Sequence, residues 1–306
     1  MSAVLVVGSV ALDSVETPFG RVDDAVGGSA TFFSASASHL VPVQLVGVVG
    51  NDYPLERLEP LRQRGVDLSG LECADGESFR WRGRYRHDLN AAETLETRLG
   101  VFSRFKPRIP DSFRKAPYVF LANIDPRLQL DVLRQVERPK LVACDTMNFW
   151  IESRRAELLE LLSRVDILLL NDSEARQLTE EYNLVRAARW ILARGPRYVV
   201  IKKGEHGAYM FSSHSVFFAP AYPLEEVFDP TGAGDSFAGG FMAYLARFGE
   251  VNDTEFRRAM VYGSVMGSFA VSQFSINGFD GVTSSHIEQR ARAFRELTHV
   301  DLAEPI

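Results

Sequence analysis

Six short, uninterrupted runs of apolar residues recur in this 306-residue chain, and they constrain its fold more than any other feature. Continuous rather than alternating hydrophobicity is typical of strands that are buried on both faces. The runs are Val4–Gly8, Val43–Val49, Tyr118–Ala122, Leu141–Asp145, Ile167–Leu170 and Tyr198–Lys202. Helical patterns separate them, at Leu55–Arg64, Leu128–Val136, Glu152–Ser163 and Leu184–Ala193. Strands alternating with helices predict βαβ units, and therefore an α/β fold around a central, mostly parallel sheet.

Two segments interrupt this alternation, at about residues 12–26 and 76–104. Within the second segment, Phe79–His87 has the period of two that is typical of a strand. One face of this strand carries Arg80, Arg82, Arg84 and Arg86, and the other carries Phe79, Trp81, Tyr85 and His87. We expect the two segments to form a small β lid, whose aromatic face either covers a substrate or forms the interface of a homodimer.

The last third of the chain contains long helical patterns, at roughly Gly234–Arg247, Thr254–Gln273 and Ser285–Leu297. Neither an internal repeat nor a linker rich in proline, glycine and serine divides the chain. We therefore expect residues 1–306 to form a single domain that includes the lid.

The composition narrows the classes of partner. The net charge is −6, from 34 basic and 40 acidic residues, whereas nucleic-acid binders normally carry a basic excess. No apolar run reaches the ~18 residues of a membrane span. We therefore expect neither a nucleic-acid nor a membrane partner. Cys73 and Cys144 form no CxxC pair, which favours two free thiols and a cytoplasmic location.

The stretch Asp229–Phe241 is the most informative part of the sequence. Gly232 and Gly234 permit backbone conformations that other residues avoid, and a helical pattern follows them. Amides at such a helix start form an anion site that the helix dipole strengthens. The acidic Asp235 inside an anion site suggests a general base acting beside a phosphate, and its alternative role is a plain helix cap.

The loop Lys202–Gly207 directly follows a predicted strand. The chain has only five lysines, and Lys202 and Lys203 are adjacent. A lysine followed by glycine suits a backbone that approaches a phosphate closely, although this is not a Walker A loop. The alternative is a hairpin turn with solvated lysines.

Asn171 and Glu174 lie three residues apart at the end of another predicted strand. On one helix face, an amide and a carboxylate suit hydrated Mg²⁺. A helix N-cap with an acidic first turn is the alternative.

Further polar residues follow the predicted strands, namely Asp13, Asn123, Asp145 and Asn171. Ligands of open parallel sheets bind outside the carboxyl ends of the strands, so these residues are expected near one site. Gly27, Gly28 and Ser29 open a helix of small residues, where a ligand can approach the main chain.

Taken together, these motifs resemble the ribokinase-like (PfkB) family of ATP-dependent carbohydrate and nucleoside kinases. The matching stretches run in the family's chain order from about residue 4 to about residue 280, and Gly47–Asp52 is among them. The resemblance implies a three-layer α/β domain of about nine strands with a small β lid. It also implies transfer of the γ-phosphoryl group of ATP to a hydroxyl of a small sugar or polyol.

The resemblance further implies roles for individual residues. Asp235 would be the base, with the amides of Gly232, Ala233 and Gly234 as the anion hole. Asn171 and Glu174 would hold Mg²⁺ through water. The nucleotide would lie along Asn171, Lys202, Gly204, Gly207 and Thr231. The acceptor would face Asp13, Gly27, Gly28, Ser29 and Asn123. Many relatives also use K⁺ near the anion hole.

The acceptor itself stays open between several classes. Phe32 stands where sugar kinases of the family often have asparagine, and with Phe33 it suits a nucleoside base or the face of an inositol ring. A cytidine or adenosine type of nucleoside kinase and an inositol kinase are therefore alternatives. A non-catalytic small-ligand sensor with this fold is an alternative of another class.

Overall fold

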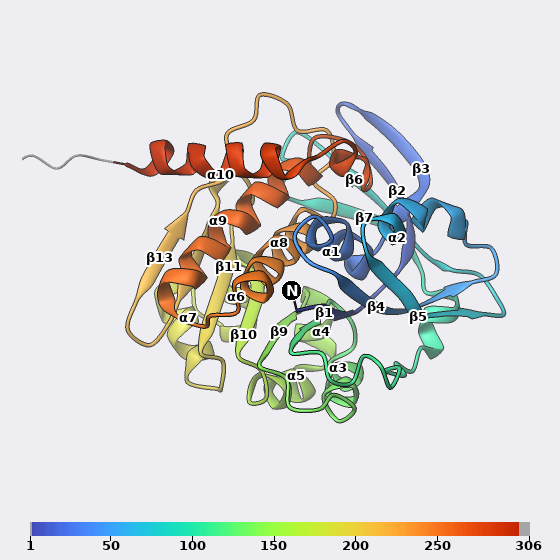
Figure 1. Ribbon diagram of the computed structural model, residues 1–306, viewed down its shortest axis with the longest axis horizontal. Coiled ribbons are helices and arrows are strands. Elements are labelled where there is room, and N and C mark those ends of the chain that lie inside the picture. The colour runs from blue at the N-terminus through green and yellow to red at the C-terminus, as the bar shows by residue number, and fades with distance from the viewer. Residues whose placement is uncertain (1, 300–306) are drawn as a thin grey trace, which may run out of the picture.

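The computed structural model describes residues 2–299, which build a large sheet between two layers of helices (Figure 1). The sheet has nine strands, and every pair from β11 to β5 is parallel. At one edge of the sheet, β12 pairs antiparallel with both β11 and β13. In spatial order the strands are β13 (Val216–Ala219), β12 (Ala208–Phe211), β11 (Tyr198–Lys202), β10 (Ile167–Asn171), β9 (Leu141–Asp145), β8 (Tyr118–Leu121), β1 (Val4–Val7), β4 (Val43–Gly50) and β5 (Val66–Ala74).

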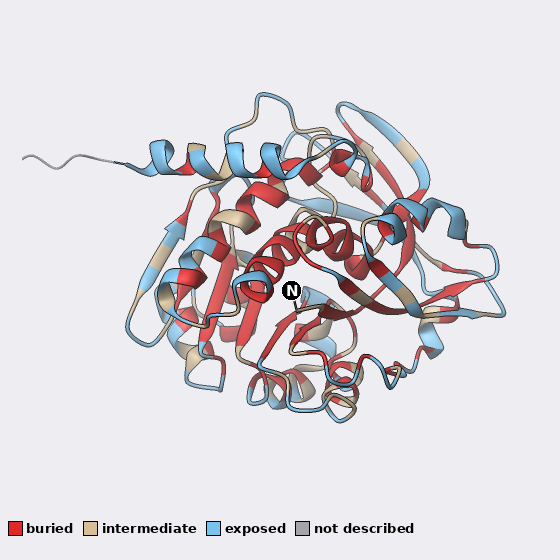
Figure 2. Ribbon diagram, in the orientation of Figure 1, coloured by how far each residue is buried: buried red, intermediate tan, exposed pale blue. Residues whose placement is uncertain are grey.

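Each face of the sheet has its own hydrophobic core. Val4 and Val6 point into one core and Leu5 and Val7 into the other, so strand β1 is buried on both sides (Figure 2). The first core is covered by α1 (Ser29–Ala37), α2 (Glu59–Gln63), α8 (Ala233–Phe248), α9 (Asp253–Ala270) and α10 (Ser284–Thr298). The second is covered by α3 (Pro126–Leu133), α4 (Asn148–Ser153), α5 (Arg155–Leu162), α6 (Asp172–Thr179) and α7 (Leu184–Leu192). The predicted three-layer α/β fold is confirmed.

A separate four-stranded sheet forms the lid, at the upper right of Figure 1. Its order is β3 (Gly20–Gly27), β2 (Ala11–Thr17), β6 (Phe79–Tyr85) and β7 (Ala92–Arg98). Strands β2 and β6 pair in parallel although some 60 residues separate them in the chain, so the two segments predicted for the lid do meet in one sheet.

The arginine face of β6 is paired with acidic side chains. Arg80 forms ion pairs with Asp24 and with Asp52, the latter at 2.8 Å. Arg84 pairs with Glu16, and Arg86 with Glu93. The lid therefore neutralises most of its own positive charge.

Several elements differ from the sequence prediction. Strand β5 was not predicted, because its polar and half-exposed residues break the apolar pattern that marks the other parallel strands. The helix predicted at Leu55–Arg64 is a 3-10 turn, Leu55–Leu58, followed by the short α2. The helix predicted at Glu152–Ser163 is divided at Arg154 into α4 and α5.

Helices α1 and α8 pack against each other closely, which fixes the start of α8 relative to the sheet. A Cβ added at Gly239 would overlap the carbonyl oxygen of Phe33. The Ser36 hydroxyl donates a 2.6 Å hydrogen bond to the Ser236 carbonyl across the same contact. The small-residue composition of α1 is thus required by this close approach. Among the described residues, no helix is long and apolar enough to cross a membrane.

This packing makes a stability prediction that a matched pair of substitutions tests. Gly239→Ala should lower the free energy of unfolding by about 1–3 kcal/mol, because the added methyl overpacks a buried helix contact. Gly267→Ala in α9 has its nearest neighbours at 3.6 and 3.9 Å, so it should be neutral or stabilising by up to about 1 kcal/mol. Urea unfolding of both variants measures the difference. Equal effects of the two substitutions would contradict the packing argument.

Candidate active site

Three predicted residues meet where neighbouring parallel strands end. Lys202 ends β11 and lies opposite Asn171 at the end of β10. Its ammonium Nζ lies 3.1 Å from Oδ2 of Asp145, which ends β9. Both side chains are largely buried, at 16% and 6% exposure, so the pair is shielded from solvent screening.

The glycine turn before α8 lies against this ion pair. Gly232 adopts φ +73° as the N-cap, a conformation that favours glycine, and a Cβ there would overlap the Phe32 ring. A Cβ added at Gly234 would lie 2.9 Å from Lys202 Nζ. The turn and the lysine loop, in which Gly234 and Lys202 are 32 residues apart in the chain, therefore line one site. Amides at the helix start and an ammonium group together suit a phosphate.

Asp235 occupies the first turn of α8 and is half-buried. Burial, followed by the charge of Asp145, raises the pKa of Asp235 to about 7, although Lys202 opposes this shift. A carboxyl group with a pKa near neutrality is suited to accept a proton from a substrate hydroxyl.

Glu174 and Lys202 respond to the same group of charges. Burial, and then Asp145, raises the pKa of Glu174 to about 7. Burial alone would lower the pKa of Lys202, but Asp145, Glu174 and Asp235 outweigh it and raise that pKa. Three carboxyl groups thus surround one ammonium group, which leaves unneutralised negative potential at the site.

Asn171 and Glu174 form the N-cap that was the alternative to a metal site. Asn171 Oδ1 accepts a hydrogen bond from the Glu174 amide at 2.8 Å, and Glu174 Oε2 accepts one from the Asn171 amide at 2.7 Å. Within residues 2–299, no group of three or more His, Cys, Asp or Glu side chains is placed to hold a metal by itself. The excess negative charge nevertheless fits a hydrated divalent cation that shares its ligands with phosphate oxygens.

Asp13 lies on lid strand β2, beside the start of α1. Its Oδ2 accepts a 3.4 Å hydrogen bond from the Gly28 amide, and a Cβ added at Gly27 would overlap its carboxyl group. Burial is the main cause that raises the pKa of Asp13 to about 7, and the charges of Asp229 and Asp235 add to it. No cation pairs with Asp13 in the part of the chain that the structure describes.

Two residues predicted to bind the acceptor are engaged in other contacts. The Ser29 hydroxyl lies 3.0 Å from that of Ser9, which also accepts a hydrogen bond from the Ser29 amide. Asn123 Oδ1 accepts a 3.0 Å hydrogen bond from the Trp150 indole. Ser29 thus fixes the start of α1 through Ser9, and Asn123 fixes the indole of Trp150.

Only one of the two adjacent lysines points into the site. Lys203 lies instead with its ammonium 5.9 Å from the centre of the Tyr209 ring. Gly207 has φ +88°, and a Cβ there would overlap the carbonyl oxygen of Ala219, so its backbone is held by β13. Gly204 contacts the lid.

Sequence reasoning gave no role to two residues that hold the glycine turn, namely Asp229 and the lid residue Tyr85. The buried Asp229 accepts hydrogen bonds from the amides of Thr231 at 2.9 Å and Ser275 at 3.3 Å. The Asp-Pro-Thr sequence carried a signal for this turn, since aspartate often bonds the amide two residues on. Thr231 Oγ1 donates a 3.3 Å hydrogen bond to the Tyr85 hydroxyl of the lid. The only sequence signal for Tyr85 was the period of two along Phe79–His87.

Comparison with known proteins identifies the family. The profile of the pfkB family of carbohydrate kinases matches residues 1–278 of this chain. The chain belongs to the PfkB family of carbohydrate kinases.

Relatives of this kinase include sugar and nucleoside kinases. It is 33% identical to a cytidine kinase of Thermococcus kodakarensis over 81% of this chain and 90% of the relative. It resembles in fold the Burkholderia thailandensis nucleoside kinase in complex with inosine, with a TM-score of 0.77, 19% identity and coverage of 95% and 98%. It also resembles a ribokinase II of E. coli in complex with ATP and Mg²⁺, with a TM-score of 0.78, 20% identity and coverage of 96% and 100%.

PfkB kinases are phosphotransferases that act on hydroxyl groups of sugars or nucleosides, and the family implies ATP and a divalent metal.

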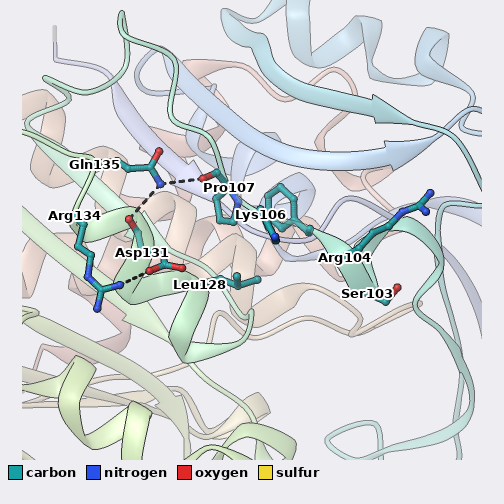
Figure 3. Close-up of a pocket in the computed structure, with 9 residues that line it drawn as sticks. Ser103, Arg104, Lys106, Pro107, Leu128, Asp131, Arg134 and Gln135 are labelled. Atoms are coloured by element: carbon teal, nitrogen blue, oxygen red, sulfur yellow. Dashed lines mark hydrogen bonds and ion pairs between the residues drawn. The ribbon is translucent and has the colours of Figure 1, made fainter.

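A shallow cavity of about 620 Å³ in this kinase shares no residue with the site described above (Figure 3). One wall is Ser103–Pro107, and the other consists of Leu128, Asp131, Arg134 and Gln135, from α3 and the residues that follow it. Gln135 Nε2 holds the two walls together through hydrogen bonds to the carbonyls of Pro107 and Asp131.

The raised pKa of Asp13 predicts how its charge affects the stability of this kinase. The folded state holds the Asp13 proton more tightly than the unfolded state, so the loss of stability caused by ionising Asp13 builds up between about pH 4 and pH 7 and is complete above pH 7. Asp13→Asn should therefore raise the free energy of unfolding by roughly 2–4 kcal/mol at pH 8. The gain should shrink as the pH falls from 7 towards 4.

Urea unfolding at pH 8, 6 and 5 measures this dependence. Asp111→Asn removes a carboxylate that is 92% exposed, and it should change the free energy of unfolding little at any of these pH values. A gain for Asp13→Asn that is independent of pH would contradict the assigned shift.

Proposed function

We propose that this kinase transfers the γ-phosphoryl group of ATP to a ribose hydroxyl of a nucleoside, with Asp235 as the general base. The observation that carries the proposal is the placement of two carboxyl groups, Asp235 in the first turn of α8 beside the glycine turn and Asp13 on lid strand β2, where burial raises the pKa of each to about 7. One is suited to deprotonate a hydroxyl, and the other to accept hydrogen bonds from two neighbouring hydroxyls.

The preference for a nucleoside over a small sugar or polyol rests on two further observations. The relative of 33% identity is a cytidine kinase. In addition, the half-buried ring of Tyr85 contacts Thr231 beside the proposed acceptor space, whereas Phe32, which the sequence suggested for a base, is buried in the core against Gly232. Rings of this kind stack on or enclose a base. A small sugar or polyol, which the sequence predicted as the first choice of acceptor, is the second candidate.

The paired arginines of the lid support an uncharged acceptor. A phosphorylated acceptor needs a dedicated cation, but Arg80, Arg84 and Arg86 of the lid each pair with a carboxylate, and among the described residues only the exposed Arg82 of this row has no ion pair. These arginines also alternate with Trp81 and Tyr85 along β6, so they lie on the other face of the strand.

In the proposed reaction, the acceptor hydroxyl gives its proton to the Asp235 carboxylate as its oxygen bonds to the γ-phosphorus. The bond from that phosphorus to the leaving ADP oxygen breaks. The amides of Gly232, Ala233 and Gly234 and the ammonium of Lys202 stabilise the transferring charge. Asn171 and Glu174 are proposed to hold Mg²⁺ through water. The bound cation would neutralise phosphate charge.

The proposed roles of K⁺ and of a homodimer remain predictions with separate tests. If K⁺ binds near the glycine turn, turnover should be faster in KCl than in NaCl at equal ionic strength. The contact between Tyr85 and Thr231 turns part of the aromatic lid face towards the chain's own glycine turn. Equal sedimentation of wild type and Trp81→Asp would contradict a dimer that forms through this face.

A panel of acceptors tests the proposed substrate class. With ATP and Mg²⁺, the kinase should phosphorylate cytidine or adenosine at kcat/KM at least ~10-fold above ribose, fructose or myo-inositol, because only the nucleosides occupy the aromatic surroundings. ADP formation measures each rate. A higher kcat/KM for a free sugar or polyol would favour the second candidate, and binding without ADP formation would favour a sensor.

Removal of the proposed base tests the mechanism. Asp235→Asn should lower kcat by about 10²–10⁴-fold and leave acceptor binding largely intact, because the amide retains the shape of the side chain. The surface substitution Asp111→Asn, which changes the net charge equally, should leave kcat unchanged. Wild-type kcat/KM should decline with a slope near one as the pH falls below about 7, since Asp235 must be ionised. A decline only near pH 4, or turnover retained in Asp235→Asn, would contradict the assignment.

A further inference from the structure

The tip of the lid reaches the loop that follows β11. Asn90 lies in the connection between β6 and β7, and Glu205 lies in the 3-10 turn η3 (Gly204–His206). Asn90 Oδ1 accepts a 3.2 Å hydrogen bond from the Glu205 amide, and Asn90 Nδ2 donates one of 3.2 Å to Glu205 Oε1. These two bonds join parts of the chain that are 115 residues apart.

The loop is shaped to receive the Asn90 side chain. Gly204 adopts φ +54°, and a Cβ added there would overlap Asn90 Oδ1. The side chain of Asp88 fixes the amide from the other side, because its Oδ1 accepts hydrogen bonds from Asn90 N at 2.9 Å and Asn90 Nδ2 at 3.1 Å. Both hydrogens of Nδ2 and the oxygen Oδ1 are thus used, which locks the orientation of the side chain.

The same hairpin also contacts the glycine turn, through a residue close to its tip. Tyr85, the last residue of β6, accepts the hydrogen bond from Thr231. One lid hairpin therefore contacts both loops that border Lys202, since Gly204 follows Lys202 in the chain and Gly234 lies against its ammonium. In the proposed function these two loops bind the phosphates of ATP.

The lid also borders the proposed acceptor site. Asp13 on β2 pairs in register with Trp81 on β6, so the strand that carries the acceptor-binding carboxylate is bonded directly to the hairpin that ends at Asn90. In the structure, this lid holds Asn90 against Gly204.

We propose that Asn90 is a positioning residue that couples closure of the lid over the acceptor to the seating of ATP phosphates on the Lys202–Gly207 loop. The coupling rests on the proposed kinase function, in which that loop binds the nucleotide. By linkage, the acceptor tightens nucleotide binding and the nucleotide tightens acceptor binding by the same factor. The role of Gly204 is then to admit Asn90, rather than to contact a phosphate.

The first arm of the test needs no ligand. Hydrogen exchange of peptides that cover residues 203–208 should be faster in Asn90→Ala than in wild type, because the Glu205 amide loses its acceptor. His87→Ala, which removes an exposed side chain from the same hairpin, should leave this exchange unchanged. Equal exchange in all three proteins overturns the contact and the proposal with it, whatever the kinase activity is.

The second arm measures the coupling. The dissociation constant of the ATP analogue AMP-PNP with Mg²⁺ is determined with and without saturating cytidine or the acceptor that the panel selects. In wild type and His87→Ala the acceptor should tighten the analogue by about fivefold or more. In Asn90→Ala the ratio should fall towards one, with kcat at saturating substrates changed much less than KM for ATP.

Gly204→Ala provides a second variant that acts from the other side of the contact. It should reduce the coupling as Asn90→Ala does, and the double variant should be no worse than either single variant, since both remove one interaction. A ratio that Asn90→Ala leaves unchanged overturns the proposal. Slow exchange at Glu205 in a protein that binds no nucleotide contradicts the proposed function, and it overturns the coupling but not the contact.

Discussion

The ion pair between Lys202 and Asp145 is the interaction on which the arrangement of the site depends. It joins the ends of β9 and β11, and the ammonium of Lys202 fills the space beside Gly234. Breaking such a buried pair leaves an uncompensated charge, which typically costs about 3–5 kcal/mol. Asp145, Glu174 and Asp235 outnumber the single lysine, so folding itself does not neutralise the site. A nucleotide that arrives with its own divalent cation matches this charge better than a free anion does.

Sequence patterns predicted the fold wherever a strand is buried on both faces. Residues such as Leu5 and Val6 must be apolar whichever core they face, so the pattern is continuous and easily recognised. Strand β5 lies at the edge of the sheet, where alternate residues are exposed, and its polar residues hid it. The close packing of α1 on α8 was visible only as an excess of small residues, because the constraint comes from a second helix that is some 200 residues away.

The candidate site was predictable where local backbone geometry demands particular residues. Gly232 is a glycine because its φ is +73°, and Lys202 follows a strand whose end faces the site. Asn171 and Glu174 cap α6, which confirms the alternative prediction made for them, and Glu174 adds negative charge beside Lys202, while their role in holding Mg²⁺ stays a prediction. The contacts of Tyr85 and Asn90 were not predictable, because nothing in the sequence near a lid strand specifies a loop that lies more than 100 residues away.

Burial links the lid to the chemistry of the site. Removal from water is the largest cause of the raised pKa of both Asp13 and Asp235, and strands of the lid provide part of the cover over Asp13. A carboxylate with a higher pKa is a stronger base, but at neutral pH it is ionised in a smaller fraction of molecules. Under the proposed function, a lid that opens would readmit water to Asp13 and lower its pKa, so the cost of burying this carboxylate would be greatest with the lid closed. Substrate hydroxyls that hydrogen-bond to Asp13 would then take the place of the lost water.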